Sequence, residues 1–261
     1  MAQVPARSLA AAARTLMLAG RWTDALALLD TARPDEAERS LLAVTAADVA
    51  VEQDFFSFTN VADRYLEAAS GCVGDADAWD LDFVRLKRAI SEEQMNGPAS
   101  WDPADRDPVV VSGLAARAVA LRDSAPDDAR RGRASFYGGI IHDLLRGDPA
   151  AGRAMYEAAR EWAAAAGDEL IVSYALRHLG YLAMQAGDLN AARADLVRSL
   201  ELRMRLGCVP QVLAQYLALA ELAQLTGDSG WAHAVAELVR DWANAGAGTR
   251  WLGPSAAELL K

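Results

Sequence analysis

Three residues first suggest acid–base chemistry: His142, Asp143 and His178. A histidine beside a carboxylate is a common general base. Adjacent residues on a helix point about 100° apart, so His142 and Asp143 do not form a pair if this segment is helical. His178 directly precedes Leu179 and Gly180, where we expect it to meet a neighbouring hairpin. We therefore assign no catalytic residue, and a non-catalytic role is our leading hypothesis.

Other sequence signatures of site chemistry are missing. Cys72 and Cys208 stand far apart, and with three scattered histidines they make no metal-binding framework. They do not resemble the disulfide set of a secreted protein either. The sequence holds no phosphate-binding loop, nucleotide fingerprint, pair of catalytic carboxylates or serine nucleophile elbow. We therefore expect no metal and no cofactor.

The composition favours closely packed helices. Of the 261 residues, 52% are hydrophobic but only 7% are aromatic, so alanine and leucine supply most of the apolar surface. This balance argues against a β-sandwich. The net charge of −10 also argues against direct nucleic-acid binding, which requires a clustered basic face. A cationic partner is permitted by this charge but not implied by it.

The beginning of the chain, "MAQVPARSLAAAARTLMLAGRW", has an apolar character that invites comparison with a signal peptide. Arg14 interrupts this run, which continues directly into a second helical pattern, "TDALALLDTA". We therefore expect mature structure here rather than a leader. No run approaches the ~18 apolar residues of a membrane-spanning helix. The sequence predicts a soluble, cytoplasmic protein without a membrane partner.

Residues 168–186 show the helical pattern most clearly. Their apolar positions recur in steps of three and four, which predicts one buried helix face. These positions are Val172, Ala175, Leu176, Leu179, Leu182, Ala183 and Ala186. Gly187 suits a left-handed helix end, and Asp188 can cap the helix that follows. Gly-Asp therefore predicts a helix stop followed at once by a helix start, which makes a tight antiparallel hairpin.

The same punctuation returns along the chain at a constant spacing. Gly-Asp pairs stand at 147/148, 187/188 and 227/228, so each lies forty positions after the one before. Upstream, Asp107-Pro108 precedes Asp148-Pro149 by one position more than that period. Patterns before residue 125 are looser but still indicate helical hairpins, with turns near Gly20 and Asp54. Repeated hairpins stack to bury faces that no single hairpin can bury. We therefore expect an all-α protein of about six hairpins.

We expect a single domain, residues 1–261, with four parts. Residues 1–94 form divergent hairpins, and residues 95–106, "MNGPASWDPADR", form an inserted loop rich in Gly, Pro and Asp. Residues 107–245 form the regular repeats. Residues 246–261 form a C-terminal cap that follows an irregular stretch.

The hairpin of residues 168–206 resembles a tetratricopeptide repeat. The matching positions are Leu176, Leu179-Gly180, Ala183, Ala192, Leu196 and Ser199. The period of forty positions exceeds the usual ~34, which longer helices would explain. In this respect the chain looks like the repeat arrays of large bacterial transcriptional activators and peptide-sensing regulators. The resemblance is good over 128–245 and loose over 1–125. It implies a right-handed α-solenoid and says little about function.

In the resembled family, the first helices of successive hairpins line a concave groove. Counted from Gly180, the implied groove-facing residues are Tyr137, Ile141, Tyr174, Arg177, Tyr181, Gln185, Glu221 and Gln224. Aromatic rings with polar tips suit a peptide or a flat organic ligand, and an arginine can hold a carboxylate. Alternatively, the tyrosines fill space between long helices.

Three functional hypotheses follow. The first is a binding or scaffold protein, possessing no DNA-binding domain of its own, that recognises a peptide, a protein segment or a small organic molecule in the groove, in a regulatory role. The second is an enzyme or sequestering protein whose pocket is enclosed by the solenoid and the 95–106 loop. In that case Trp101 acts as a lid, whereas it otherwise anchors the loop to the convex side. The third is self-assembly into a homodimer through a terminal hairpin or the 245–255 stretch.

Overall fold

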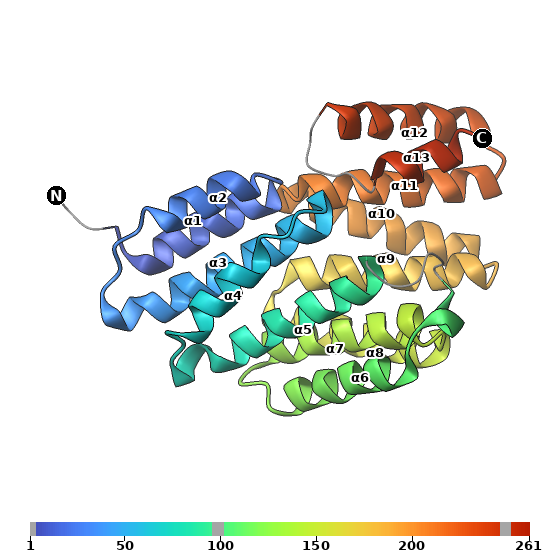
Figure 1. The fold of residues 1–261 in the computed structure, drawn as a ribbon. Helices are drawn as coiled ribbons and strands as arrows, with labels where there is room; N and C mark the ends of the chain where they lie inside the picture. Colours follow the sequence, from blue (N-terminus) through green and yellow to red (C-terminus); the bar gives the residue numbers. More distant parts are fainter. Residues whose placement is uncertain (1–3, 96–101, 246–251) are drawn as a thin grey trace.

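The computed structural model describes residues 4–95, 102–245 and 252–261. Within these ranges the protein is all-helical and has no β-strand (Figure 1). Its α-helices are α1 (Ala6–Leu18), α2 (Trp22–Asp30), α3 (Glu36–Ser57), α4 (Ala62–Ser70), α5 (Ala78–Met95), α6 (Pro108–Asp123), α7 (Asp128–Ile140), α8 (Pro149–Ala166), α9 (Glu169–Gln185), α10 (Leu189–Leu206), α11 (Val209–Leu225), α12 (Ser229–Asn244) and α13 (Leu252–Leu259). Two 3-10 turns, η1 (Asp75–Asp77) and η2 (Pro103–Asp105), and a π-helical turn, η3 (Ile141–Leu145), complete the described elements.

Neighbouring helices pack on one another in chain order, and the predicted hairpins are present. They are α1–α2, α3–α4, α5–α6, α7–α8, α9–α10 and α11–α12, and α13 packs on α11 and α12. The predicted turn near Asp54 is also present, because its carboxylate accepts from the backbone N–H groups of Val61 and Ala62 at the start of α4. None of the described helices has the length and apolarity needed to cross a membrane.

Glycines end the helices of the second half of the chain at regular intervals, at half the period seen in the Gly-Asp pairs. Gly147, Gly167, Gly187, Gly207 and Gly227 all adopt a positive φ, which only glycine reaches at little cost. Aspartates cap the helices that begin after four of these glycines, as at Asp188, whose Oδ1 lies 3.0 Å from the N of Ala191. Cys208 follows Gly207 and provides no side-chain cap. Gly207 is therefore the one glycine of this series whose next helix begins without an aspartate cap.

The π-helical turn η3 absorbs one extra residue. Gly147 follows the cap Asp127 by twenty positions, whereas Gly187 follows the cap Asp168 by nineteen. A one-residue insertion within a helix is accommodated as a π-turn. Before that turn, α7 and α9 remain in register when each is counted from its capping aspartate. Gly139 therefore lies against Tyr156 just as Gly180 lies against Leu196 one hairpin later.

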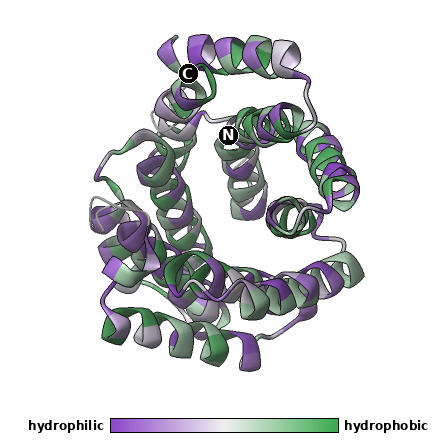
Figure 2. Ribbon diagram, turned by 90° about the vertical axis from the view of Figure 1, so that its right-hand side faces the viewer, coloured by the Kyte–Doolittle hydropathy of each residue, from purple (hydrophilic) through white to green (hydrophobic). Residues whose placement is uncertain are grey.

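The two halves of the chain meet near its ends. A Cβ placed on Gly20, in the turn after α1, would lie 3.1 Å from Cγ of Pro210 at the start of α11. The helices accordingly follow a ring-like path in the view of Figure 2. Glu52 of α3 also acts electrostatically on Tyr174 of α9 and on Cys208, although α3 packs mainly on α1, α2, α4 and α5. The first half of the chain therefore faces the helices α9 and α11.

Candidate functional site

Polar and aromatic side chains gather where α9, α10 and α11 meet. We call them the α9–α11 cluster: Tyr174, Arg177, Tyr181, Arg203, Gln211, Gln215 and Glu221. Tyr174, Arg177 and Tyr181 are spaced about one turn apart on α9, so they share a face, and all three are partly exposed. The Arg177 guanidinium lies 5.0 Å from the centroid of the Tyr181 ring. Four members, Tyr174, Arg177, Tyr181 and Glu221, belong to the set expected from the sequence.

Arg177 joins α9 to α11. Its Nη1 donates to the backbone oxygen of Ala214 over 2.8 Å and to Oε1 of Gln215 over 3.2 Å. These acceptors are neutral, and Arg177 forms no ion pair with an acidic side chain of the described residues. Neutral acceptors therefore hold its guanidinium in place, and the nearby Glu221 carboxylate interacts with it electrostatically.

Tyr181 and Glu221 form a second link between the same helices. The hydroxyl of Tyr181 donates to the Glu221 carboxylate. Burial raises the pKa of Tyr181 to about 12, and burial also raises the pKa of Glu221. Both groups are thus poorly solvated, which strengthens electrostatic effects at this end of the cluster.

Arg203 is the most unusual member of the cluster, because it is only 3% exposed. Its Nη1 donates to the backbone oxygen of Gln211 over 2.9 Å, and its guanidinium lies 5.2 Å from the centroid of the Tyr174 ring. Its Nε has no partner, and no acidic side chain of the described residues pairs with it. Burial, together with the nearby charge of Arg177, lowers the pKa of Arg203 to about 9. A buried charge without a counter-ion is destabilising.

Gln211 leaves a second polar atom unsatisfied beside Arg203. Its Nε2 donates to the hydroxyl of Tyr174 over 3.2 Å, but its Oε1 is buried without a partner. Gln215, by contrast, is fully engaged, since its Nε2 donates to the Leu196 oxygen over 2.9 Å and its Oε1 accepts from Arg177. The unsatisfied polar atoms of the cluster therefore gather next to Tyr174.

The repeat itself contains the signal that would have found these residues. Arg203 occupies the helix position held by Ala163 one period earlier and by Ala243 one period later. Gln211 likewise stands where α9 has Ile171, a core residue. Departures from a repeat toward buried polar residues mark a place where packing alone does not explain the choice of side chain.

The other expected groove residues have different places. Ile141 is fully buried in the core, so its interpretation as a groove residue was wrong. Counting back one period from Tyr181 ignored the extra residue that η3 absorbs. Gln185 is exposed at the end of α9, and Nε2 of Gln224 donates to the Leu259 oxygen of α13. Trp101 lies outside the described residues.

Tyr137 belongs to a different group, which faces α3 and α5. Its ring packs edge-on against Phe83 with 5.3 Å between centroids, and burial raises its pKa. Nearby, Nζ of Lys87 lies 2.6 Å from Oδ1 of Asp48 and 2.7 Å from Oε1 of Glu52. Burial alone would lower the pKa of Lys87, but these two carboxylates raise it well above its usual value. The sequence analysis did not identify this triad, because Lys87 of α5 is distant in the sequence from Asp48 and Glu52 of α3.

His178 packs against the preceding hairpin, which confirms its expected place. Its ring stacks on Tyr156 with 4.8 Å between centroids. Tyr156 OH donates to Oδ2 of Asp143 over 3.1 Å, whereas Nδ1 of His178 lies 3.9 Å from that oxygen, beyond a hydrogen bond. Burial, with the nearby charge of Arg177, lowers the pKa of His178 to about 3, so the imidazole is neutral. His142 and Asp143 form no hydrogen bond with one another, as expected from their adjacency.

The described residues contain no group of three or more His, Cys, Asp or Glu side chains placed to hold a metal ion. The arrangement at the α9–α11 cluster suits binding of an anion, because it offers a buried arginine without an acidic partner, Arg203, beside a second arginine and together with tyrosine and amide groups. The chain matches no protein-family model and no curated protein.

Proposed function

We propose that this protein is a non-catalytic binding module of the tetratricopeptide type, an α-solenoid whose α9–α11 cluster takes the carboxylate of a peptide or of a small organic acid. One observation carries the proposal: Arg203 is buried without a counter-ion, and the positive charge of Arg177 lies nearby. A bound carboxylate would supply the missing negative charge, and charge-assisted hydrogen bonds of this kind are the strong ones.

The surrounding groups favour an organic acid over an inorganic ion. Tyr174 is partly exposed and covers the Arg203 guanidinium, so a ligand reaching this arginine meets an aromatic ring. Tyr181 offers a second ring beside Arg177. Aromatic side chains with polar tips bind ligands that combine apolar and polar parts. A peptide end or a small acid has both parts, and a regulatory module needs to recognise such a ligand reversibly.

A sequestering role for a small molecule is the second candidate. The contact between Gly20 and Pro210 favours it, because it joins the N-terminal turn to α11 and so limits the access of a long chain segment to the cluster. Both candidates use the same arginines. They differ in the size of the ligand, and the mass of the bound species distinguishes them.

Substitution of Arg203 by methionine tests the proposal. Methionine is unbranched, so it refills the space of the arginine stem without its charge. Replacing an uncompensated buried ion is expected to stabilise the free protein by about 1–4 kcal/mol. The same substitution should abolish the rise in melting temperature that carboxylate ligands cause in the wild type. The probes are a pool of short peptides with free C-termini, the same pool with amidated C-termini, and a set of small carboxylic acids.

Arg198→Met is the matched control. Arg198 lies on the same helix, but its side chain is exposed and paired with Glu201 over 2.8 Å. This variant should leave both stability and binding close to wild type. Native mass spectrometry of the purified protein gives the mass of any retained ligand. If no carboxylate probe stabilises the wild type and Arg203→Met lowers the melting temperature, Arg203 serves only to join α10 to α11 and the proposal is wrong.

A further inference from the structure

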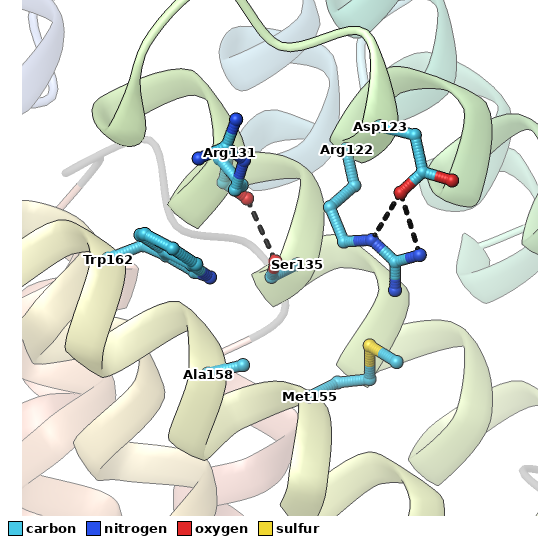
Figure 3. A pocket seen from close by; sticks show the side chains of 7 residues that line it. All are labelled: Arg122, Asp123, Arg131, Ser135, Met155, Ala158 and Trp162. Atoms are coloured by element: carbon cyan, nitrogen blue, oxygen red, sulfur yellow. Dashed lines mark hydrogen bonds and ion pairs between the residues drawn. The ribbon is translucent and has the colours of Figure 1, made fainter.

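A pocket of about 450 Å³ lies between α6, α7 and α8, away from the α9–α11 cluster (Figure 3). Its walls come from the end of α6, from positions 131–135 of α7 and from positions 155–162 of α8. The lining residues are Arg122, Asp123, Arg131, Ser135, Met155, Ala158 and Trp162. This volume is in the range of pockets that hold small organic molecules.

The pocket exists because of a small residue on α7. Ser135 follows the cap Asp127 by eight positions, and the same position on α9, counted from Asp168, is Leu176. Leu176 is buried, so a large side chain fills this position in the following hairpin. Ser135 instead turns its hydroxyl back to the Arg131 oxygen over 2.9 Å. Serine at this position leaves open a space that the repeat otherwise closes.

Trp162 provides an aromatic wall. Its side chain is 38% exposed although tryptophan is the largest apolar residue, and Arg131 lies 4.8 Å from its ring centroid. One period later the same helix position is Leu202, which is buried. Figure 3 shows the indole edge directed toward Ser135. An exposed ring that a guanidinium holds in place is a surface for stacking a flat ligand.

Two guanidinium groups, those of Arg122 and Arg131, also line the pocket. Arg122 uses Nε and Nη2 to hold Asp123, over 2.9 and 2.8 Å. Its Nη1 is left for another acceptor, and in Figure 3 one guanidinium nitrogen points away from Asp123 toward Met155. Arg131 uses Nη1 to hold Asp128 over 2.9 Å. Each arginine is therefore oriented by one carboxylate and retains further N–H donors.

We propose that this pocket binds a small aromatic carboxylate. The ring of the ligand stacks on Trp162 and contacts Met155 and Ala158, and its carboxylate accepts hydrogen bonds from Arg122 and Arg131. The exposed indole offers a surface for stacking, and the N–H donors that Arg122 and Arg131 retain offer hydrogen bonds to an anionic group. The site shares no residue with the α9–α11 cluster, so this proposal is independent of the proposed function and is tested separately.

Titration calorimetry with indole-3-acetate tests the site, with indole-3-acetamide and acetate as comparison ligands. Indole-3-acetate should bind the wild-type protein. Indole-3-acetamide lacks the charge and acetate lacks the ring, so each should bind at least about tenfold more weakly. Saturation-transfer NMR on the same samples should show the strongest transfer to the indole protons. Equal binding of the acid and the amide would overturn the assignment of an anion site.

Three substitutions locate the binding. Ser135→Leu fills the pocket with the residue that the next hairpin already uses, and Trp162→Ala removes the stacking wall. Arg131→Gln removes a guanidinium, and each change should weaken indole-3-acetate binding by about tenfold or more. Trp242→Ala is the control, because Trp242 is a comparably exposed tryptophan on the distant helix α12.

Circular dichroism melting establishes that each variant is folded. If Ser135→Leu does not fold, Ala158→Leu fills the same pocket from α8 and replaces it. Binding that is unchanged in the pocket variants, or absent from the wild type at millimolar indole-3-acetate, would overturn the proposal. Loss of binding in Arg203→Met with the pocket variants unaffected would overturn it as well, since the ligand would then occupy the α9–α11 cluster.

Discussion

The guanidinium of Arg203 lies 5.2 Å from the ring centroid of Tyr174, and the two side chains come from adjacent antiparallel helices, α10 and α9. The Tyr174 hydroxyl, in turn, accepts a hydrogen bond from Gln211 of α11. A single tyrosine therefore connects a buried cation to the next hairpin. Its ring contacts the charge, and its hydroxyl accepts from Nε2 of Gln211, whose Oε1 has no partner.

Tyr174→Phe should separate these two roles. Phenylalanine keeps the ring over Arg203 but removes the acceptor of Gln211 Nε2, so the buried amide loses its side-chain partner. Leaving a buried donor unpaired costs about 1–3 kcal/mol. We expect a lower midpoint in urea unfolding with an unchanged slope. A midpoint equal to that of the wild type would mean that water replaces the hydroxyl as acceptor.

Gly180→Ala should destabilise the α9–α10 hairpin. A Cβ at this position would lie 2.8 Å from Cγ of Leu196, closer than side chains pack. Overpacking of this kind costs about 1–3 kcal/mol. The double variant Gly180→Ala/Leu196→Ala should recover part of the lost stability, because the next hairpin pairs Ala220 with Ala236 at the same positions.

The control for this prediction is Gly113→Ala in α6. Gly113 is also inside a helix, but a Cβ there has no atom within 4 Å. Alanine should therefore stabilise the protein by about 0.5–1 kcal/mol through helix propensity. Thermal unfolding of both variants beside the wild type gives the two opposite signs. Effects of the same sign would contradict the packing argument.

Acidification should remove stability through His178. The pKa of this imidazole is about 3 in the folded protein against 6.5 in its ordinary state, because burial disfavours the charged form. The contribution of this histidine to the free energy of unfolding is complete above pH 6.5. It is lost progressively as the pH falls from 6.5 toward 3, with a slope of up to about 1.4 kcal/mol per pH unit. Asp143 acts in the opposite sense, since burial raises its pKa.

The variant His178→Phe isolates this effect. Phenylalanine keeps the stacking on Tyr156 and has no titrating group, while Asp143 is retained. The difference in unfolding free energy between wild type and variant should therefore change with pH below 6.5 and be constant above it. Parallel stability profiles between neutral and mildly acidic pH would show that His178 is not buried in its neutral form.

Lys87→Met should destabilise the contact between α3 and α5. It would leave the carboxylates of Asp48 and Glu52 close together without the cation that now holds both. Breaking a buried ion pair from one side costs about 3–5 kcal/mol. The triple variant with Asp48→Asn and Glu52→Gln removes the stranded charges and should recover most of that loss. Denaturant unfolding of the single and triple variants measures both steps.

Local features of the sequence determined most of the helix boundaries. Gly187 adopts the left-handed conformation expected at a helix end, and the Asp188 side chain accepts from the N–H of Ala191 at the start of α10, both within a few residues along the chain. The apolar face of α9 also followed from spacing, since Leu179 and Ala183 are buried. These are short-range effects, so a single sequence is enough to predict them.

Counting by the repeat period failed where the helix itself departs from regular geometry. The count placed Ile141 in register with Tyr181, but the π-turn at 141–145 shifts that register by one position and Ile141 enters the core. Nothing in the periodicity showed which helix would carry the extra residue. Trp101, the lid residue of the enclosed-pocket hypothesis, lies outside the described part of the chain.

Only the tertiary structure decided which charges lose their solvent. Arg203 and Arg198 are both arginines of α10. Arg203 is buried under Tyr174, whereas Arg198 stays exposed and paired with Glu201. Likewise, Ser135 marks a pocket only because α6, α7 and α8 pack around it. Burial and charge compensation depend on neighbours that are distant in the sequence, so helix spacing sets the face of a side chain while the packed fold sets its electrostatic environment.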